Sequence, residues 1–334
     1  MTEAPDWPRA SSWLQPPGTG STAGRGSGSA TRLGVLGVPL SRSSLSPSSA
    51  HLTPAAIRAA LHRFPTWHAG LDVDLPAAID HGDLDVAGLA GGEAVAAVHK
   101  GVAALPPHEL VVLLGGDNLV TWPALLALLP DLPRVGLLTM DAHHDVRGWS
   151  AGPTNGTPVR GLVEAGLPGA NVVQVGIAEL TNSRAHREWC RTHGIRVVRV
   201  AQCRGRVGDI VRRELDTLAV RCDAVYVDLD VDVVDRAFVP GCPGARPGGL
   251  LPAELLDAAL EAGRHPAVRA VDIVEVDASA DVNEVTVQLA AMCLLTAAAG
   301  LAVRAHATPG RGSAGEGTGE DLPGEDGFGG ETQD

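Results

Sequence analysis

The sequence predicts an α/β fold in three layers, with a central, mostly parallel sheet and helices on both faces. Short runs of Val, Ile and Leu, such as 33–40 and 109–116, alternate with Ala/Leu-rich stretches of helical length. These runs are apolar almost throughout, which is typical of parallel strands covered on both faces. The apolar share of 45% is ample for the core that such a sheet needs.

The expected elements follow one another along most of the chain. Besides the two runs above, we expect strands at 134–142, 171–177, 195–200, 224–231 and 268–276. Helices are expected at 54–63, 93–104, 121–129, 184–193, 208–219, 252–263 and 283–303. The first of these helices begins at a proline, which favours a helix N-terminus. In a sheet of this kind the ligand site lies beyond the carboxyl ends of the strands.

Both ends of the chain differ in composition from the middle. Residues 1–30 are rich in Gly, Ser, Pro and Thr, and residues 308–334 are Gly-rich and acidic. Such segments bury too little apolar surface to offset their chain entropy. We therefore expect two disordered tails around one folded domain at 31–307, a size that suits a single α/β domain.

Charge and cysteine usage exclude several classes of function. The net charge of −13 argues against nucleic acid and against a polybasic membrane anchor, since both need a basic surface. We find no signal-peptide pattern, and no apolar run of membrane-spanning length without a charge or a turn signal. The five cysteines are scattered without a CxxC pair, which indicates reduced thiols in a cytoplasmic protein. Four of them fit small buried hydrophobes, and the role of Cys242 is left open.

Four of the expected strands end in polar clusters. These are GGDN at 115–118, DAHHD at 141–145, DLDVD at 228–232, and Glu275. Residues two apart in an extended chain point to the same side. Asp141, His143 and Asp145 are therefore expected to converge, and so are Asp230 and Asp232.

Carboxylates packed this closely at the end of a buried sheet repel one another unless a cation lies among them. Oxygen ligands with an imidazole suit Mn²⁺ better than a thiolate-type zinc site would. Two divalent cations can make water a nucleophile at neutral pH. For any one cluster, capping a helix or forming a turn is an equally good interpretation. Four clusters together favour a metal-dependent hydrolase.

These motifs resemble those of the arginase/agmatinase (ureohydrolase) superfamily. GGDN, DAHHD, DVDVVDRAFVPGCP and VDIVEV occur in the order and form of the superfamily's motifs, over about residues 33–303. The resemblance implies an arginase-like fold and a binuclear Mn²⁺ centre, two ions per subunit. It assigns Asp141, His143, Asp145, Asp230 and Asp232 as metal ligands. It also assigns Glu275 to the substrate's amidinium group and leaves Asp228 as an extra carboxylate.

Within the superfamily the motifs are most similar to those of formimidoylglutamase, through DAHHDVR, GPTNGTPVRGL and PGCPGARPGG. Arginases and agmatinases usually carry a proton-shuttling His where this chain has Asn155. The resemblance implies hydrolysis of N-formimidoyl-L-glutamate to L-glutamate and formamide, a step of histidine degradation. Asp145 is then expected to protonate the leaving amine.

A substrate with two carboxylates needs local cations in an acidic protein. Arg147, Arg160 and Arg246 are the candidates, because arginine binds carboxylates through two parallel hydrogen bonds. An ordinary surface or ion-pair role is an equal alternative for each. We expect Asn155 and Thr157 to hydrogen-bond the same end of the substrate.

Asn118 departs from the superfamily pattern, which has a histidine ligand there. An amide oxygen is a weaker donor, so we expect one tight and one weak Mn²⁺ site. Capping of the following helix is the alternative role for Asn118. His144, the odd member of DAHHD, is expected to face away from the metals.

Two further functions remain open at this stage. One is a guanidino hydrolase, of agmatinase or guanidinobutyrase type, that releases urea; Asn155 counts against it. The other is a metal-poor homologue that binds a ligand without catalysis, which Asn118 favours. The resemblance also implies a homo-oligomer, and the expected partner is a small anionic amidine rather than nucleic acid or membrane.

Overall fold

The computed structural model describes residues 7–18 and 32–304. A parallel sheet of nine strands forms its centre, in the order β1-β5-β2-β6-β11-β10-β7-β8-β9. The strands are β1 (Leu14–Gln15), β2 (Leu33–Val38), β5 (Ala78–Asp83), β6 (Leu110–Gly115), β7 (Val135–Met140), β8 (Val172–Ile177), β9 (Arg196–Arg199), β10 (Ala224–Asp230) and β11 (Val268–Val274).

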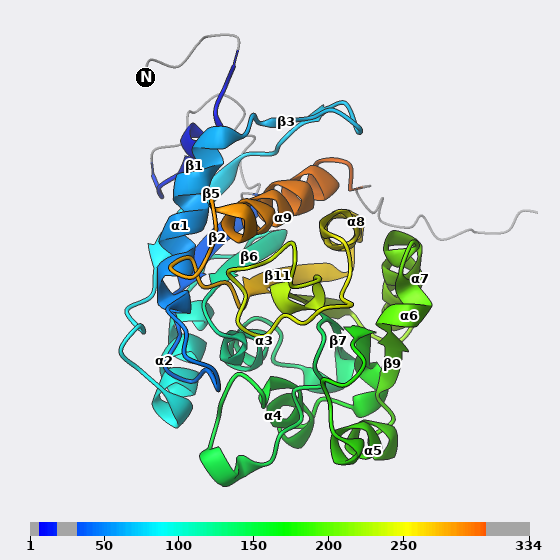
Figure 1. Ribbon diagram of the computed structural model, residues 1–334. Coiled ribbons are helices and arrows are strands. Elements are labelled where there is room, and N and C mark those ends of the chain that lie inside the picture. Colours follow the sequence, from blue (N-terminus) through cyan, green and yellow to red (C-terminus); the bar gives the residue numbers. More distant parts are fainter. Residues whose placement is uncertain (1–6, 19–31, 305–334) are drawn as a thin grey trace, which may run out of the picture.

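Helices cover both faces of this sheet, which confirms the three-layer prediction (Figure 1). One face packs against α1 (Thr53–Ala60), α7 (Val207–Ala219), α8 (Pro252–Arg264) and α9 (Val285–Ala302). The other packs against α2 (Gly91–Ala103), α3 (Thr121–Leu128), α4 (Pro158–Glu164) and α5 (Arg184–Thr192). The short helix α6 (Val200–Cys203) joins β9 to α7. Strands β2, β6, β7 and β8 are buried along their whole length, as their apolar sequences predict.

Several elements escaped the sequence prediction. Strand β5 has the sequence AIDHGD and lies between β1 and β2. Its polar residues do not give the apolar pattern that predicts a buried strand. Helix α4 has only seven residues and contains a glycine. The hairpin of β3 (Trp67–His68) and β4 (Val73–Asp74) is likewise too short to show a period. These elements are set by tertiary contacts rather than by local pattern.

The predicted disordered tail at 1–30 is wrong for residues 7–18. Strand β1 pairs with β5, Ala10 is fully buried, and the Trp13 indole N–H donates to the Pro76 carbonyl at 2.8 Å. Apolar residues in this short stretch supply the burial, which an average over all thirty residues conceals. The rest of the predicted N-terminal tail, and the predicted C-terminal tail at 308–334, lie outside the described residues.

Helix α9 is long and apolar enough to cross a membrane by length and composition alone. This corrects the expectation that no such run exists. About 72% of the apolar window is buried inside the protein, where α9 packs between α1 and α8. The helix is therefore explained as a core element of this fold.

Candidate active site

The four polar clusters come together at the carboxyl end of the sheet, as predicted. They follow β6, β11, β10 and β7, which are consecutive neighbours in the sheet. A pocket at this edge has a volume of about 100 Å³. Its lining includes His143, Asp145, Asp230, Asp232 and Glu275.

Asp141, His143 and Asp232 form the tightest group of candidate metal ligands. One ligand atom from each lies within 4.8 Å of the others. His143 Nδ1 is 2.7 Å from Asp232 Oδ2 and 3.5 Å from Asp141 Oδ1. Both carboxylates are buried, while the imidazole is partly exposed toward the pocket.

Alternation along an extended strand, from which the sequence predicts this convergence, is not what the structure shows. Strand β7 ends at Met140, so DAHHD is a loop. Asp141 accepts a hydrogen bond from the His143 backbone N–H at 2.6 Å, and Asp145 has a positive φ of 51°. Asp232 likewise lies in a 3₁₀ turn, where its backbone N–H donates to Asp230 at 2.7 Å. The conformation of these loops, and not a strand, therefore orients the side chains toward one another.

The cluster holds more negative charge than its own groups can balance. Burial and the charge of Asp232 raise the pKa of Asp141 to about 7. Burial also raises the pKa of Asp145 and Asp230 well above the usual range, with neighbouring carboxylates adding to it. The charge of Asp232 raises the pKa of His143 to about 12. A bound cation would relieve this repulsion, so the donor set fits divalent metal ions.

Asn118 lies in the same cluster. Its amide Nδ2 donates to Asp145 Oδ2 at 2.7 Å, and its Oδ1 accepts from the Thr121 hydroxyl at 2.7 Å. The helix-capping alternative belongs instead to Asp117, which accepts a hydrogen bond from the Leu119 backbone N–H.

Glu275 follows β11 and has a positive φ of 64°. Its Oε1 accepts two hydrogen bonds, from the Asn118 backbone N–H at 2.8 Å and from Asn155 Nδ2 at 3.0 Å. Among the described residues no donor is found for Oε2, which leaves this oxygen for a ligand in the pocket. Burial, with the charge of Asp117, raises the pKa of Glu275 to about 8.

The predicted substrate-binding residues divide into two groups. Arg147, Asn155 and Arg246 line the pocket. Arg160 and Thr157 do not, and the structure corrects that expectation. The Arg160 guanidinium lies 5.1 Å from the centre of the Trp189 ring. The Thr157 hydroxyl is buried and donates to the Thr154 carbonyl at 2.8 Å.

Sequence reasoning missed one wall of the pocket, the segment with Leu45 and Ser46. The Leu45 backbone N–H donates to Asn155 Oδ1 at 3.0 Å, and the Asn155 backbone N–H donates to the Ser43 carbonyl at 3.0 Å. Asn155 thus connects this segment to Glu275. The serine-rich run at 41–49 carries no ligand pattern, so no signal in the sequence marks it.

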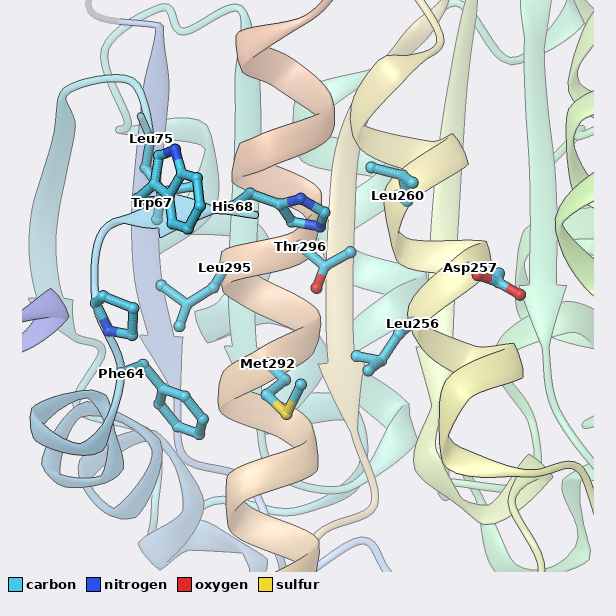
Figure 2. Close-up of a pocket in the computed structure, with 11 residues that line it drawn as sticks. Phe64, Trp67, His68, Leu75, Leu256, Asp257, Leu260, Met292, Leu295 and Thr296 are labelled. Atoms are coloured by element: carbon cyan, nitrogen blue, oxygen red, sulfur yellow. The ribbon is translucent and has the colours of Figure 1, made fainter. Parts of the chain in front are cut away.

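A second pocket, of about 310 Å³, lies away from these strand ends (Figure 2). Leu256 of α8 and Met292 and Leu295 of α9 line it, together with Phe64 and Trp67 before and in β3. His68 and Asp257 are its only ionisable residues among those described. It lacks a set of groups that could carry out hydrolysis, so the candidate active site is the pocket at the strand ends.

Comparison with known proteins agrees with this geometry. The profile of the Arginase family matches residues 31–300. The chain belongs to the Arginase family, a family of hydrolases.

Formimidoylglutamases are prominent among the relatives of this arginase-family chain. That of Halalkalibacterium halodurans is 36% identical over 272 residues, which cover 78% of this chain and 85% of the relative. The agmatinase of Bacillus subtilis is 32% identical over 180 residues, covering 53% of this chain and 59% of the relative. The agmatinase match is thus confined to a smaller part of both chains.

Solved structures of formimidoylglutamases match the fold of this chain. The crystal structure of Bacillus subtilis formimidoylglutamase superposes with a TM-score of 0.82 and 29% identity, covering 91% of this chain and 95% of that one. A structure of Trypanosoma cruzi formiminoglutamase with Mn²⁺ has a TM-score of 0.77 and covers 90% and 100% of the two chains. Its 23% identity shows a likeness of fold alone.

Three further residues lie near the site of this arginase-family chain. His144 faces away from the cluster, as predicted, with its Nδ1 2.6 Å from Gln174 Oε1. Asp228 is buried and lies opposite Asp272 of β11. Burial and the charge of Asp272 raise the pKa of Asp228. Cys242 is fully buried, and burial raises the pKa of its thiol well above 9. A thiol held neutral in this way is a poor nucleophile.

Proposed function

We propose that this chain is a formimidoylglutamase that uses two Mn²⁺ ions per chain. It hydrolyses N-formimidoyl-L-glutamate to L-glutamate and formamide. The observation that carries the proposal is the pocket itself, where Asp141, His143, Asp145, Asp230 and Asp232 meet beside Glu275 and Asn155. The two bacterial formimidoylglutamases named above, which match over most of both chains, support the same activity.

Asn118, Asp141, His143, Asp145, Asp230 and Asp232 would hold the metal ions. Two divalent cations held there would supply a more acidic, and so more reactive, water beside the amidine carbon. Water then adds to that carbon, the bond from the carbon to the glutamate nitrogen breaks, and this nitrogen takes up a proton. The products are formamide and glutamate.

The chain's own groups position the substrate for this reaction. Glu275 Oε1 is held by two protein donors, so Oε2 can accept a hydrogen bond from the amidinium N–H groups. Arg147 and Arg246 lie at the exposed side of the pocket and would bind the two carboxylates of the substrate. Asp145, raised in pKa by burial, would carry the proton to the leaving nitrogen.

A guanidino hydrolase is the second candidate, and Asn155 is the observation against it. Its amide hydrogen-bonds Glu275 and the Leu45 backbone, and an amide cannot shuttle a proton as an imidazole does. A metal-poor binding protein is the third candidate. The concentrated, unbalanced carboxylates count against it, because such a cluster needs a cation.

One assay separates the three. The protein is purified with Mn²⁺ and offered formimidoylglutamate, agmatine and 4-guanidinobutyrate, with formamide, glutamate and urea measured. We expect formamide and glutamate in equal amounts from the first substrate and no urea from the other two. Urea release would replace the proposal with a guanidino hydrolase, and no product from any substrate would favour a binding protein.

We also propose a cytoplasmic location. All five cysteines are buried and unpaired, which suits a reducing compartment. Fractionation of cells that express the tagged protein would test this, and recovery with the membrane fraction would contradict it.

A further inference from the structure

The hydroxyl of Thr121, the first residue of α3, faces two acceptors with one proton. Its Oγ1 lies 2.7 Å from Asn118 Oδ1 and 2.7 Å from Asp272 Oδ2. A hydroxyl donates only one hydrogen bond, so one of these two contacts must run in the other direction. Thr121 and Asp272 are completely buried, and Asn118 nearly so. No bulk water reaches them to resolve the conflict.

Asp272 is the stronger acceptor of the two. Its Oδ2 also accepts a hydrogen bond from the Tyr226 hydroxyl at 2.8 Å, so Thr121 would be the second hydroxyl donor to the same oxygen. Burial raises its pKa to about 6, which leaves it ionised at neutral pH. Hydrogen bonds to an ionised acceptor are about twice as strong as neutral ones. The Thr121 proton therefore belongs to Asp272.

Asn118 must then present a donor to Thr121. Rotation of the amide by half a turn achieves this, because it exchanges Nδ2 and Oδ1 in nearly the same space. Nδ2 would donate to the Thr121 hydroxyl, and Oδ1 would face Asp145 Oδ2, which lies 2.7 Å from the atom that Oδ1 replaces. Two oxygen acceptors at that distance repel each other unless a cation lies between them.

We propose that Thr121, held by Asp272, is a positioning residue that turns the Asn118 carbonyl oxygen toward a divalent cation shared with Asp145. In the metal-loaded protein the hydrogen-bond chain runs from Asn118 Nδ2 to Thr121 and from Thr121 to Asp272. Without the cation, Asn118 instead donates to Asp145, as in the described structure. Metal binding is thus coupled to rotation of one buried amide.

This inference rests on the proposed metal site, and it explains how a weak amide ligand is made effective. A freely rotating asparagine amide loses side-chain entropy when it binds a metal ion, whereas an amide held by a buried hydroxyl and carboxylate is already oriented. The Mn²⁺ affinity of the site then depends on Thr121 and Asp272 as well as on Asn118.

The test is Mn²⁺ titration calorimetry on the metal-free full chain, with no substrate present. Thr121→Val keeps the side-chain shape but loses the hydroxyl, and Thr121→Ser keeps the hydroxyl. We expect Thr121→Val to weaken one of two Mn²⁺ sites by about 10- to 100-fold, the usual effect of losing a partner behind a ligand. The other site should be unchanged, and Thr121→Ser should bind like wild type.

A double-mutant comparison separates positioning from simple loss of structure. Asn118→Ala should weaken the same site, and adding Thr121→Val to it should cause no further loss, because Thr121 acts through Asn118. Additive losses, unchanged affinity in Thr121→Val, or a wild-type protein that binds one Mn²⁺ would each overturn the inference.

Two controls keep the result interpretable. If Thr121→Val does not fold, Asp272→Asn replaces it, and the same single site must weaken. Formamide release is measured separately on wild type. A protein that shows the Thr121 effect but releases no formamide would contradict the proposed reaction and leave the positioning inference standing. A protein that releases formamide but shows no Thr121 effect would contradict the positioning inference and leave the reaction standing.

Discussion

His143 and Asp232 form an ion pair across two neighbouring strand ends, with Nδ1 2.7 Å from Oδ2. Although burial alone would raise the pKa of Asp232, the charge of His143 and its hydrogen bond hold that pKa below the usual value. This imidazole is the only cationic side chain in direct contact with the buried carboxylates of the site within the described part of the chain. One positive charge among so many carboxylates makes the metal-free protein sensitive to pH.

The stability of the metal-free protein should fall as pH rises from about 5 to 8. The pKa values of Asp117, Asp141 and Glu275 are raised to about 6, 7 and 8. Between the unfolded value near 4 and these folded values, the folded chain binds more protons than the unfolded chain. The free energy of unfolding therefore decreases with pH in this window. Thermal melts in the presence of a chelator would measure it.

With saturating Mn²⁺ this dependence should vanish or reverse, because the ligands bind the metal in their deprotonated form. The upward shift in melting temperature on adding Mn²⁺ should thus be larger at pH 8 than at pH 5.5. A metal-free protein that becomes more stable over this range would contradict the assignment of raised pKa values.

Removing one carboxylate from the cluster should remove metal. Asp230 is buried, and its Oδ1 also holds the turn that carries Asp232. We expect Asp230→Ala to lower the Mn²⁺ content from two ions per chain to one or none, and to reduce kcat/KM by at least about 100-fold. Elemental analysis of the reconstituted protein measures the first effect. Asp216→Ala, an exposed aspartate on α7, is the matched control and should retain both ions.

The arginines should differ in their effect on an anionic substrate. Arg147 and Arg246 line the pocket, whereas Arg160 packs on Trp189. Arg147→Ala and Arg246→Ala should each lower kcat/KM for formimidoylglutamate by about 10- to 100-fold, mainly through KM, since each loses a charge-assisted hydrogen bond. Arg160→Ala, an equal loss of charge, serves as the control. The assignment fails if Arg160→Ala costs as much as the other two.

Asn155 should act by holding Glu275 and the Leu45 segment together. Its Nδ2 donates to Glu275 and its Oδ1 accepts from the Leu45 backbone N–H. Asn155→Ala removes one of the two donors to Glu275 Oε1 and the acceptor of the Leu45 backbone N–H. Loss of one hydrogen bond to the buried carboxylate costs about 1–3 kcal/mol. We expect kcat to fall together with an increase in protease cleavage near 41–49 in the metal-loaded protein. Asn155→Asp, which keeps the acceptor alone, should preserve the segment but repel Glu275, and unchanged cleavage in Asn155→Ala would argue against a link.

The sequence alone determined the parallel sheet and most of the helices, because continuous Val/Ile/Leu runs such as those of β6 and β7 have few stable arrangements other than burial between two layers. It also predicted that polar clusters at four strand ends would come together at one edge of the sheet. These predictions succeed because a residue's type and its place after a strand are local properties.

Only the tertiary structure decided which side chains face the pocket. Arg160 and Thr157 lie in the same motif as Asn155, yet α4 begins at Pro158 and turns Arg160 toward Trp189. Long-range contacts hold the Leu45 segment at the pocket, among them the hydrogen bond from its backbone N–H to Asn155, 110 residues later in the chain. The contact of Thr121 with Asp272 joins residues 151 positions apart. Direction and long-range contact depend on how the layers pack, which no local pattern in the chain encodes.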